Sequence, residues 1–235
     1  MSPGLARVRR DGSTAVFELD RPADLTGALL DSLDWTGDTP KAAFRFKEPA
    51  TEASLPDLSV LPGTYIARIG YAARTADLAA PAAPPPASKG EWRTPTDLEA
   101  LKTLTRTTLI ERFYEPWREL ESPEFLKDVE AFLEHGLALD ASALFLVEGR
   151  EAGLIAMMAH RDCFGRPVDH IAWVWIDESL TPPERAGAHA RLVEWLARKP
   201  SGRIQAFVHG FNARSRRFFG KIGFTPTCLH ISRRP

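Results

Sequence analysis

The hydrophobic positions near the end of the sequence change from strand-like to helix-like spacing and back. Residues 204–209 (IQAFVH) form a short apolar run that is typical of a strand. From Asn212 the apolar side chains recur at helical spacing as far as Ile222, and Gly223 is a residue that commonly ends a helix. Phe224 then starts a second apolar run. The pattern predicts a strand, a short helix and another strand.

Similar patterns predict a series of elements between residues 91 and 198. Thr96 and Glu99 have the spacing of a capping box, which predicts the start of a first helix. Ser122 and Pro123 predict the start of a second helix, which Gly136 ends. The remaining predictions are strands at residues 143–147, 153–159 and 170–176, a loop at 160–168, and a helix at 182–198 with a capping box of Thr181 and Glu184.

Residues 1–77 carry a weaker pattern, which predicts a small α/β module of unknown role. Its expected elements are strands at residues 14–19, 42–46 and 63–71 and a helix at 22–33. Residues 78–90 (LAAPAAPPPASKG) differ in composition, because their prolines remove backbone donors and favour extended geometry. We expect a linker there, followed by a second domain over residues 91–235.

Composition narrows the functional classes. The chain has 235 residues, of which 44% are hydrophobic and 26% charged, as in an ordinary globular protein. Its net charge of -1 gives no field that would recruit nucleic acid or an anionic membrane. Cys163 and Cys228 make neither a metal-ligand pair nor a disulfide framework. No apolar run reaches the roughly 20 residues of a membrane helix, and the first residues lack the apolar stretch of a secretory signal, so we expect a cytoplasmic protein.

The strand, helix and strand around Asn212 resemble the closing motif of the GNAT N-acetyltransferase superfamily. That motif has an asparagine, a small residue three positions on, an aromatic pair and then Gly-Phe. Its positions in this chain are Asn212, Ser215, Phe218, Phe219, Gly223 and Phe224. An ordinary amphipathic helix packed on a sheet would explain neither the asparagine nor the turn after the helix. The order of the predicted elements extends the resemblance over residues 91–235, and the short N-terminal module adds a resemblance to the bacterial dTDP-fucosamine acetyltransferase group.

The resemblance implies an α/β (α+β) fold, in which helices flank a mixed, mostly antiparallel sheet. It implies that an acyl group passes from acetyl-CoA to a primary amine by direct attack in a ternary complex, with no metal. The expected partner is a small-molecule or peptide amine, and residues 1–76 are available for a homodimer contact. A second interpretation is a GNAT-fold protein that binds acyl-CoA or another protein and has little or no transfer activity.

The resemblance also implies that coenzyme A lies at the start of the helix at 182–198, where backbone N–H groups meet its pyrophosphate. The family signature there is Arg or Gln, two residues, Gly, one residue, then Gly or Ala. Gly187 matches it, whereas Glu184 and His189 replace the first and last positions. Glu184 brings negative charge towards the phosphates, and a capped helix start has fewer free N–H groups. The residues assigned to coenzyme A are Ser179, Leu180, Arg185, Ala186, Gly187, Ala188, His189, Asn212, Ser215, Arg217 and Phe219.

Acyl transfer requires a base for the amine and a proton for the leaving thiolate. His170 lies in the region where several family members carry a carboxylate, and an unperturbed imidazole pKa of about 6.5 suits a base. Asp177 and Glu178 are the alternative bases, and a structural hydrogen bond is an equally good interpretation of His170. In the family a Tyr often supplies the proton at the position of Phe219, which has none to give. Four aromatic residues either line an acceptor pocket or pack in the core: Tyr114, Trp117, Trp173 and Trp175.

Overall fold

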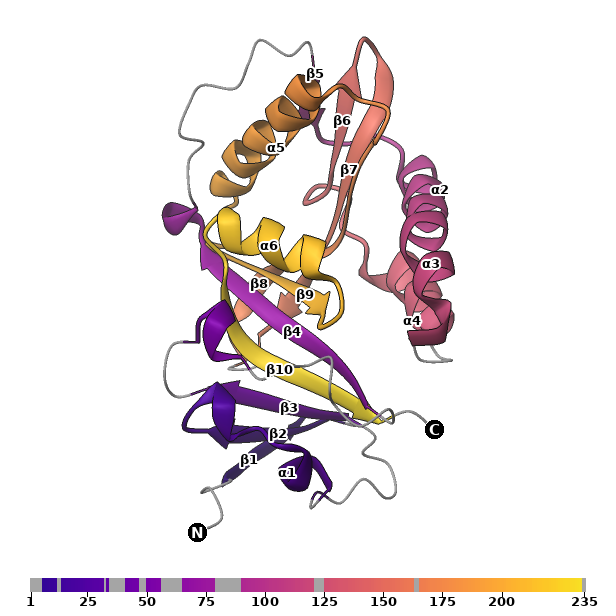
Figure 1. Cartoon of the computed structure of the whole chain (residues 1–235). Coiled ribbons are helices and arrows are strands. Elements are labelled where there is room, and N and C mark those ends of the chain that lie inside the picture. The colour runs from indigo at the N-terminus through magenta and orange to yellow at the C-terminus, as the bar shows by residue number, and fades with distance from the viewer. Residues whose placement is uncertain are drawn as a thin grey trace. The chain divides into compact units, whose positions relative to one another are not determined.

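The structure is a computed structural model of the whole chain (Figure 1). It describes residues 6–11, 14–31, 33, 41–46, 50–55, 65–78, 90–120, 125–162 and 165–233. The chain divides into two compact units. Unit 1 comprises residues 1–73, 163–166 and 206–235, and unit 2 comprises residues 74–162 and 167–205.

Unit 2 contains four antiparallel strands in the order β8-β7-β6-β5, with helices on both faces. Its strands are β5 (Gly90–Arg93), β6 (Ala143–Val147), β7 (Arg150–Arg161) and β8 (Pro167–Ile176). Its longer helices are α2 (Leu98–Leu109), α4 (Phe125–Ala131) and α5 (Pro182–Ala197). Its short helical segments are η3 (Thr75–Asp77), the π-helical turn η4 (Ile110–Tyr114), α3 (Glu115–Trp117), η5 (Arg118–Leu120) and the π-helical turn η6 (Phe132–Gly136).

The two faces of this sheet carry separate hydrophobic clusters, because successive strand residues point to opposite sides. Leu144 of β6 and Leu154 of β7 pack with Leu101 of α2 on one face. Phe145 of β6 packs with Ala188 of α5 on the other face. Helices α2 and α5 therefore cover opposite sides of β6 and β7, as Figure 1 shows.

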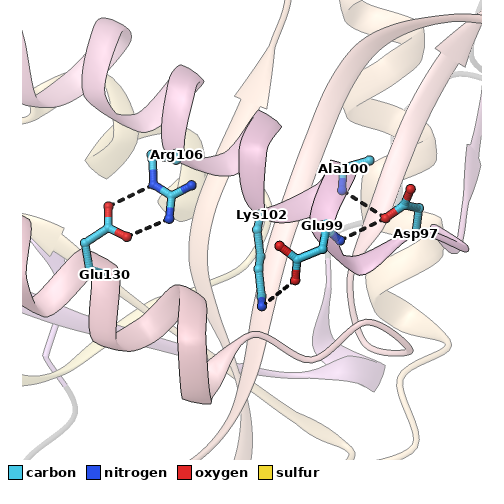
Figure 2. A network of polar contacts seen from close by, with 6 residues as sticks. All are labelled: Asp97, Glu99, Ala100, Lys102, Arg106 and Glu130. Atoms are coloured by element: carbon cyan, nitrogen blue, oxygen red, sulfur yellow. Dashed lines mark hydrogen bonds and ion pairs between the residues drawn. The ribbon is translucent and has the colours of Figure 1, made fainter.

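The start of α2 differs from the sequence prediction. The N-cap is Asp97, whose carboxylate accepts hydrogen bonds from the backbone N–H groups of Glu99 (2.9 Å) and Ala100 (3.0 Å). The predicted capping box on Thr96 is wrong by one residue, because an aspartate beside it is an equally good N-cap. Figure 2 shows this cap, and further along α2 the two bonds from Arg106 to Glu130 of α4.

The strand predictions for unit 2 are confirmed, with extensions. Strand β6 has the predicted bounds, whereas β7 and β8 run into the predicted loop at 160–168 and leave a short connection. Strand β5 was not predicted. Helix α5 begins at Pro182, directly after Thr181, as predicted. The helical turn η6 ends at Gly136, as expected. The predicted helix start at residues 122–123 lies outside the described residues, as does the linker between Leu78 and Gly90.

Unit 1 contains five strands in the order β1-β2-β3-β10-β4. Among the strand pairs described within unit 1, β2 and β3 are parallel, and β1–β2, β3–β10 and β10–β4 are antiparallel. Its elements are β1 (Ala6–Asp11), β2 (Thr14–Leu19), η1 (Pro22–Asp24), α1 (Gly27–Asp31), β3 (Lys41–Phe46), η2 (Glu52–Ser54), β4 (Tyr65–Arg74), α6 (Ala213–Lys221) and β10 (Thr225–Arg233). Strand β9 (Arg203–His209) runs along the chain from unit 2 into unit 1.

Strand β10 joins the beginning and the end of the sequence. Leu229 lies opposite Phe44 of β3 on one side and Ile69 of β4 on the other, and it is fully buried. The structure thus groups residues 206–235 with the N-terminal strands, which differs from the expected division at residues 78–90. The reason is that β10 completes its hydrogen bonding with β3 and β4. In the described part of the chain, no helix is long and apolar enough to cross a membrane.

Candidate functional site

The N-terminus of α6 carries the motif asparagine. Asn212 is the N-cap, and its Oδ1 accepts a hydrogen bond from the backbone N–H of Ser215 at 3.0 Å. Among the described residues, nothing accepts a hydrogen bond from the Asn212 Nδ2 group. After the helix, Gly223 has φ +96°, a conformation that glycine adopts without strain, and the chain turns into β10. The asparagine thus fixes the helix start while its amide donor remains available.

The predicted site residues on α6 have different surroundings. Arg217 is exposed and has no hydrogen bond or ion pair within the described part of the chain. Phe219 is only 6% exposed and stacks against Tyr71 of β4, with ring centroids 6.2 Å apart. Its ring also meets Phe224 edge-on at 5.1 Å. Phe219 is therefore a core residue of unit 1, and its environment favours a packing role over contact with a substrate.

The start of α5 has few free backbone donors. Pro182 and Pro183 have no N–H, and the Arg185 N–H is bonded to the Thr181 carbonyl at 3.0 Å. Thr181 and Glu184 form the predicted capping box, in which the carboxylate of Glu184 accepts from the Thr181 N–H (2.8 Å) and hydroxyl (2.7 Å). A helix start binds phosphate through free N–H groups. This one is occupied by its own cap, and it carries a carboxylate.

The next residues of α5 face the core more than the surface. Gly187 and Ala188 are buried, and the Ala188 carbonyl accepts a hydrogen bond from Trp92 Nε1 of β5 at 3.0 Å. Ala186 is exposed, and His189 is partly exposed. The Arg185 guanidinium donates to the Glu178 carbonyl at 2.7 Å, so it is turned back onto the preceding loop. Of the residues matched to the phosphate signature, Gly187 and Ala188 are buried, and the other four reach the surface: Glu184, Arg185, Ala186 and His189.

The loop between β8 and α5 is held by Asp177. Its Oδ2 pairs with the Arg150 guanidinium at 2.5 Å, and its Oδ1 accepts the Ser179 N–H at 2.9 Å. The Arg150 hydrogen bond, and then the Ser179 N–H, lower the pKa of Asp177 to about 2. A carboxylate with that pKa is a weak base at neutral pH. Its partners indicate a structural role in the loop.

Ser179 and Leu180 have their backbone N–H groups occupied. The Ser179 N–H bonds Asp177 Oδ1, and the Leu180 N–H bonds the Asp177 carbonyl at 3.3 Å. The Leu180 side chain is buried with Phe145 and Ala188. Glu178 is exposed, and its backbone carbonyl accepts a hydrogen bond from the Arg185 guanidinium.

A β-bulge places His170 on the face of the sheet that α2 covers. Trp173 lies opposite Ala156 and Ile171 lies opposite Met157, so Ala172 is an extra residue on β8. His170 lies opposite Met158, and residues opposite each other in an antiparallel pair share a face. His170 is 8% exposed, and its ring lies 5.3 Å from that of His160. The bulge thus brings His170 to the same face as Trp173.

The neighbours of His170 test two other expectations. Asp169 lies opposite Ala159, on the other face of the sheet, so it does not orient the His170 ring. Trp173 and Trp175 pack in the cluster around Leu101, which favours the core interpretation of both. Trp173 Nε1 donates to Thr108 of α2 at 3.0 Å, and its ring meets Phe113 at 6.0 Å.

The predicted residues therefore fall into two groups. Unit 2 contains His170 and residues 177–189, and unit 1 contains Asn212, Ser215, Arg217 and Phe219. Sequence reasoning missed Arg150 and Trp92, because pairs so distant in sequence leave no periodic signal. It also missed the bulge at Ala172. Within the described ranges, no group of three or more His, Cys, Asp or Glu side chains could hold a metal ion.

Comparisons with known proteins give a distant likeness in fold. No protein-family model matches the chain, and no curated protein matches it. A GCN5-related N-acetyltransferase from Kribbella flavida is 14% identical over 99% of this chain and 88% of its own, with a TM-score of 0.44. An acetyltransferase of the GNAT family from Novosphingobium aromaticivorans is 16% identical over 94% and 83%, with a TM-score of 0.41. A protein of unknown function from Staphylococcus epidermidis is 9% identical over 99% and 95%, with a TM-score of 0.48.

Proposed function

We propose that this protein is a GNAT-type N-acyltransferase that moves an acyl group, most simply acetyl, from acyl-CoA to a primary amine. The observation that carries the proposal is the strand–helix–strand segment made by β9, α6 and β10. Asn212 caps α6 through Ser215, and Gly223 turns the chain into β10 at the spacing of the superfamily motif. The helices and strands of residues 98–233 also follow the order that the resemblance implies.

Coenzyme A is bound mainly through the α6 region in this proposal. The Asn212 Nδ2 group and the exposed Arg217 guanidinium are donors available for a pantetheine carbonyl and a phosphate oxygen, respectively. The Ser215 hydroxyl is a further donor. The α5 start fits a pyrophosphate poorly, because Pro182 and Pro183 have no N–H, the Arg185 N–H is already bonded, and Glu184 is negative. We therefore expect weak binding of the phosphates there.

His170 acts as the base in this proposal. It is on the same face as Trp173, and a neutral imidazole can take a proton near pH 7. Asp177 is less suitable, because its pKa of about 2 keeps it unprotonated and weakly basic. Glu178 is exposed and remains an alternative base. The amine nitrogen attacks the thioester carbonyl, a C–N bond forms as the C–S bond breaks, and water protonates the thiolate because Phe219 cannot.

A second candidate is a GNAT-fold protein that binds an acyl-CoA or a protein without catalysing transfer. It is favoured by the α5 start, where the capping box and two prolines remove the donors that a pyrophosphate needs. It is also favoured by Phe219, whose ring is in the core and carries no acidic proton. The two candidates differ in turnover and not in fold.

The test is a calorimetric titration with acetyl-CoA followed by a thiol-release assay over a panel of amines. The transferase proposal expects both binding and amine-dependent release of free thiol. Absence of binding at about 1 mM acetyl-CoA would contradict both acyl-CoA proposals. Binding without thiol release would favour the second candidate.

The residue-level test compares His170→Gln with His160→Gln, a substitution at an exposed neighbour. Loss of a general base lowers kcat by about 10² to 10⁴-fold, with a small change in KM. We expect this loss for His170→Gln, together with the loss of the acidic limb of the pH–rate profile. His160→Gln should keep both. Equal rates in the two variants would remove His170 from the proposal and leave Glu178 to be tested in the same way.

A further inference from the structure

Lys199, which follows α5, has an environment unlike that of the other described lysines. It is partly buried, and its Nζ donates a hydrogen bond to the Ala141 carbonyl at 2.7 Å. The same Nζ lies 3.4 Å from the centre of the Trp195 ring. No carboxylate lies within ion-pair distance of it in the described part of the chain. The ammonium is thus held by one neutral oxygen and one aromatic face.

The charges around Lys199 come from two other elements of unit 2. Asp140 precedes β6 and is exposed, and Asp169 on β8 lies on the face of the sheet opposite His170. Both carboxylates favour the protonated amine at longer range, but burial outweighs them and lowers the pKa of Lys199 to about 8. The Trp195 ring also favours the cation. Even so, about a tenth of the Lys199 side chains would be neutral at pH 7, against about one in a few thousand for an ordinary lysine.

The three other lysines with described side chains provide a contrast. Lys127 and Lys221 are exposed, with no hydrogen bond or ion pair in the described part of the chain. Lys102 forms an ion pair with Glu99 at 2.7 Å. A desolvated amine without a carboxylate partner is the form that reacts as a nucleophile. The surroundings of Lys199 therefore favour reaction over ion pairing.

We propose that Lys199 is a modification site of this protein, at which an activated acyl donor (an acyl thioester or an acyl phosphate) transfers its acyl group to Nζ. The neutral amine attacks the donor carbonyl, and a C–N bond forms as the C–S or C–O bond breaks. The electron pair leaves with the thiolate or phosphate, and the surplus amine proton passes to water. The product amide keeps one N–H for the Ala141 carbonyl and has no charge to desolvate. This inference does not depend on the proposed transferase activity.

The reaction should be faster at Lys199 than at an exposed lysine, though by less than the difference in neutral fraction. Nucleophilicity falls as pKa falls, with a Brønsted slope of about 0.4–0.5 in the case of thiols. If amines follow a similar slope, about half of the logarithmic advantage remains. We therefore expect about a tenfold higher rate at Lys199 than at Lys221 at pH 7.

The test treats the full chain with acetyl phosphate in one arm and acetyl-CoA in the other, at pH 7, and follows each lysine by peptide-resolved mass spectrometry. Preferential acetylation of Lys199 in the acetyl phosphate arm supports intrinsic reactivity. Preference in the acetyl-CoA arm alone supports the site with a thioester donor bound by the protein. Acetylation of Lys199 no faster than of Lys127 and Lys221 in both arms would overturn the proposal. If the protein does not bind acetyl-CoA, the transferase proposal fails, but preferential acetylation of Lys199 by acetyl phosphate would still support this one.

Two variants control the assignment. Lys199→Arg keeps the charge and can still donate to a carbonyl, but it removes the reactive amine, so the signal at this position must disappear. Trp195→Leu removes the ring that covers Nζ and exposes the amine to water. Provided that the variant keeps its circular dichroism spectrum, the advantage of Lys199 over Lys221 should fall to about threefold or less. An unchanged advantage would mean that the enclosure described here does not cause the reactivity.

Discussion

Asn212 and Ser215, two fixed positions of the sequence motif, are joined by a hydrogen bond from the Ser215 N–H to Asn212 Oδ1 at 3.0 Å. The bond uses only the carbonyl side of the asparagine amide, so one side chain can cap the helix and donate to a ligand at once. This division of roles can be separated by substitution.

We expect Asn212→Ala to lower the free energy of unfolding by about 1 kcal/mol, because the cap is lost. Asn212→Asp retains the acceptor and should keep most of that stability. The aspartate cannot donate, so it should still weaken acetyl-CoA binding as measured by calorimetry. If Asn212→Asp binds acetyl-CoA as tightly as the unchanged protein, the asparagine has a structural role alone.

Glu184→Gln should raise the affinity for acetyl-CoA. Glutamine can take the place of glutamate in a capping box, so the helix start is retained while its negative charge is removed. Relief of about 1 kcal/mol of repulsion corresponds to about a fivefold lower Kd. Glu184→Ala is the matched control for the cap, and we expect it to lose stability in thermal denaturation. An unchanged Kd in Glu184→Gln would mean that the phosphates do not lie near α5.

Phe219→Tyr should not restore the proton donor that the family often has at this position. The ring is enclosed by Tyr71 and Phe224, so a hydroxyl added there would be buried without a designed partner, at a cost of about 1–3 kcal/mol. We expect a lower melting temperature and no gain in kcat. Phe218→Tyr, at a partly exposed position, should change stability by about 0.5 kcal/mol or less. A rise in kcat for Phe219→Tyr would contradict the core assignment.

Arg150→Ala should make the protein less stable at neutral pH, and the difference should shrink to about a third at pH 2.5. The pKa of Asp177 is lowered to about 2 in the folded protein, so the pair contributes stability above the unfolded pKa of about 3.9, which is lost as the pH falls towards 2. Arg150 is 56% exposed, so we expect about 1 kcal/mol at pH 7. Urea unfolding at pH 7 and pH 2.5 measures this. Arg93→Ala removes an exposed pair with Glu91 and should have little effect at either pH.

Lys199 should make stability depend on pH in the alkaline range. Its folded pKa of about 8 lies below the unfolded value of about 10.4, so the unfolded chain holds more protons between these limits. The free energy of unfolding should therefore rise, relative to that of Lys199→Gln, from about pH 8 to about pH 10.4. Urea unfolding of both proteins across this range gives the difference. A difference that stays constant with pH would mean that burial does not perturb this amine.

The sequence predicted elements better than it predicted partners. The bounds of β2 and β6 were predicted correctly, because each is a short apolar run between polar turns. The start of α5 was predicted from Thr181, two prolines and Glu184, because these residues in this order are typical of the first turn of a helix. The cap of α2 was placed on Thr96 and not on Asp97, because two good capping residues stand side by side. Strand bounds and helix starts can therefore be predicted from a single sequence where neighbouring residues determine them.

The candidate site was harder to predict for a physical reason. Asn212 could be assigned to a helix start from its neighbours, and the structure confirms that position. The ion pair between Asp177 and Arg150 depends on the pairing of strands β7 and β8, which periodicity does not encode. The bulge at Ala172, which sets the face of His170, likewise depends on register.

The position of β10 between β3 and β4 affects the order in which the molecule can form. Both neighbours leave the ribosome long before β10, so during synthesis each has an unsatisfied edge that can pair with another chain. Hydrogen bonds between such distant segments also close slowly. The exposed N-terminal strands should therefore make folding depend on chaperones, and the yield of refolding from denaturant should fall as the protein concentration rises. Both effects should end only when residues 225–233 have paired with these strands.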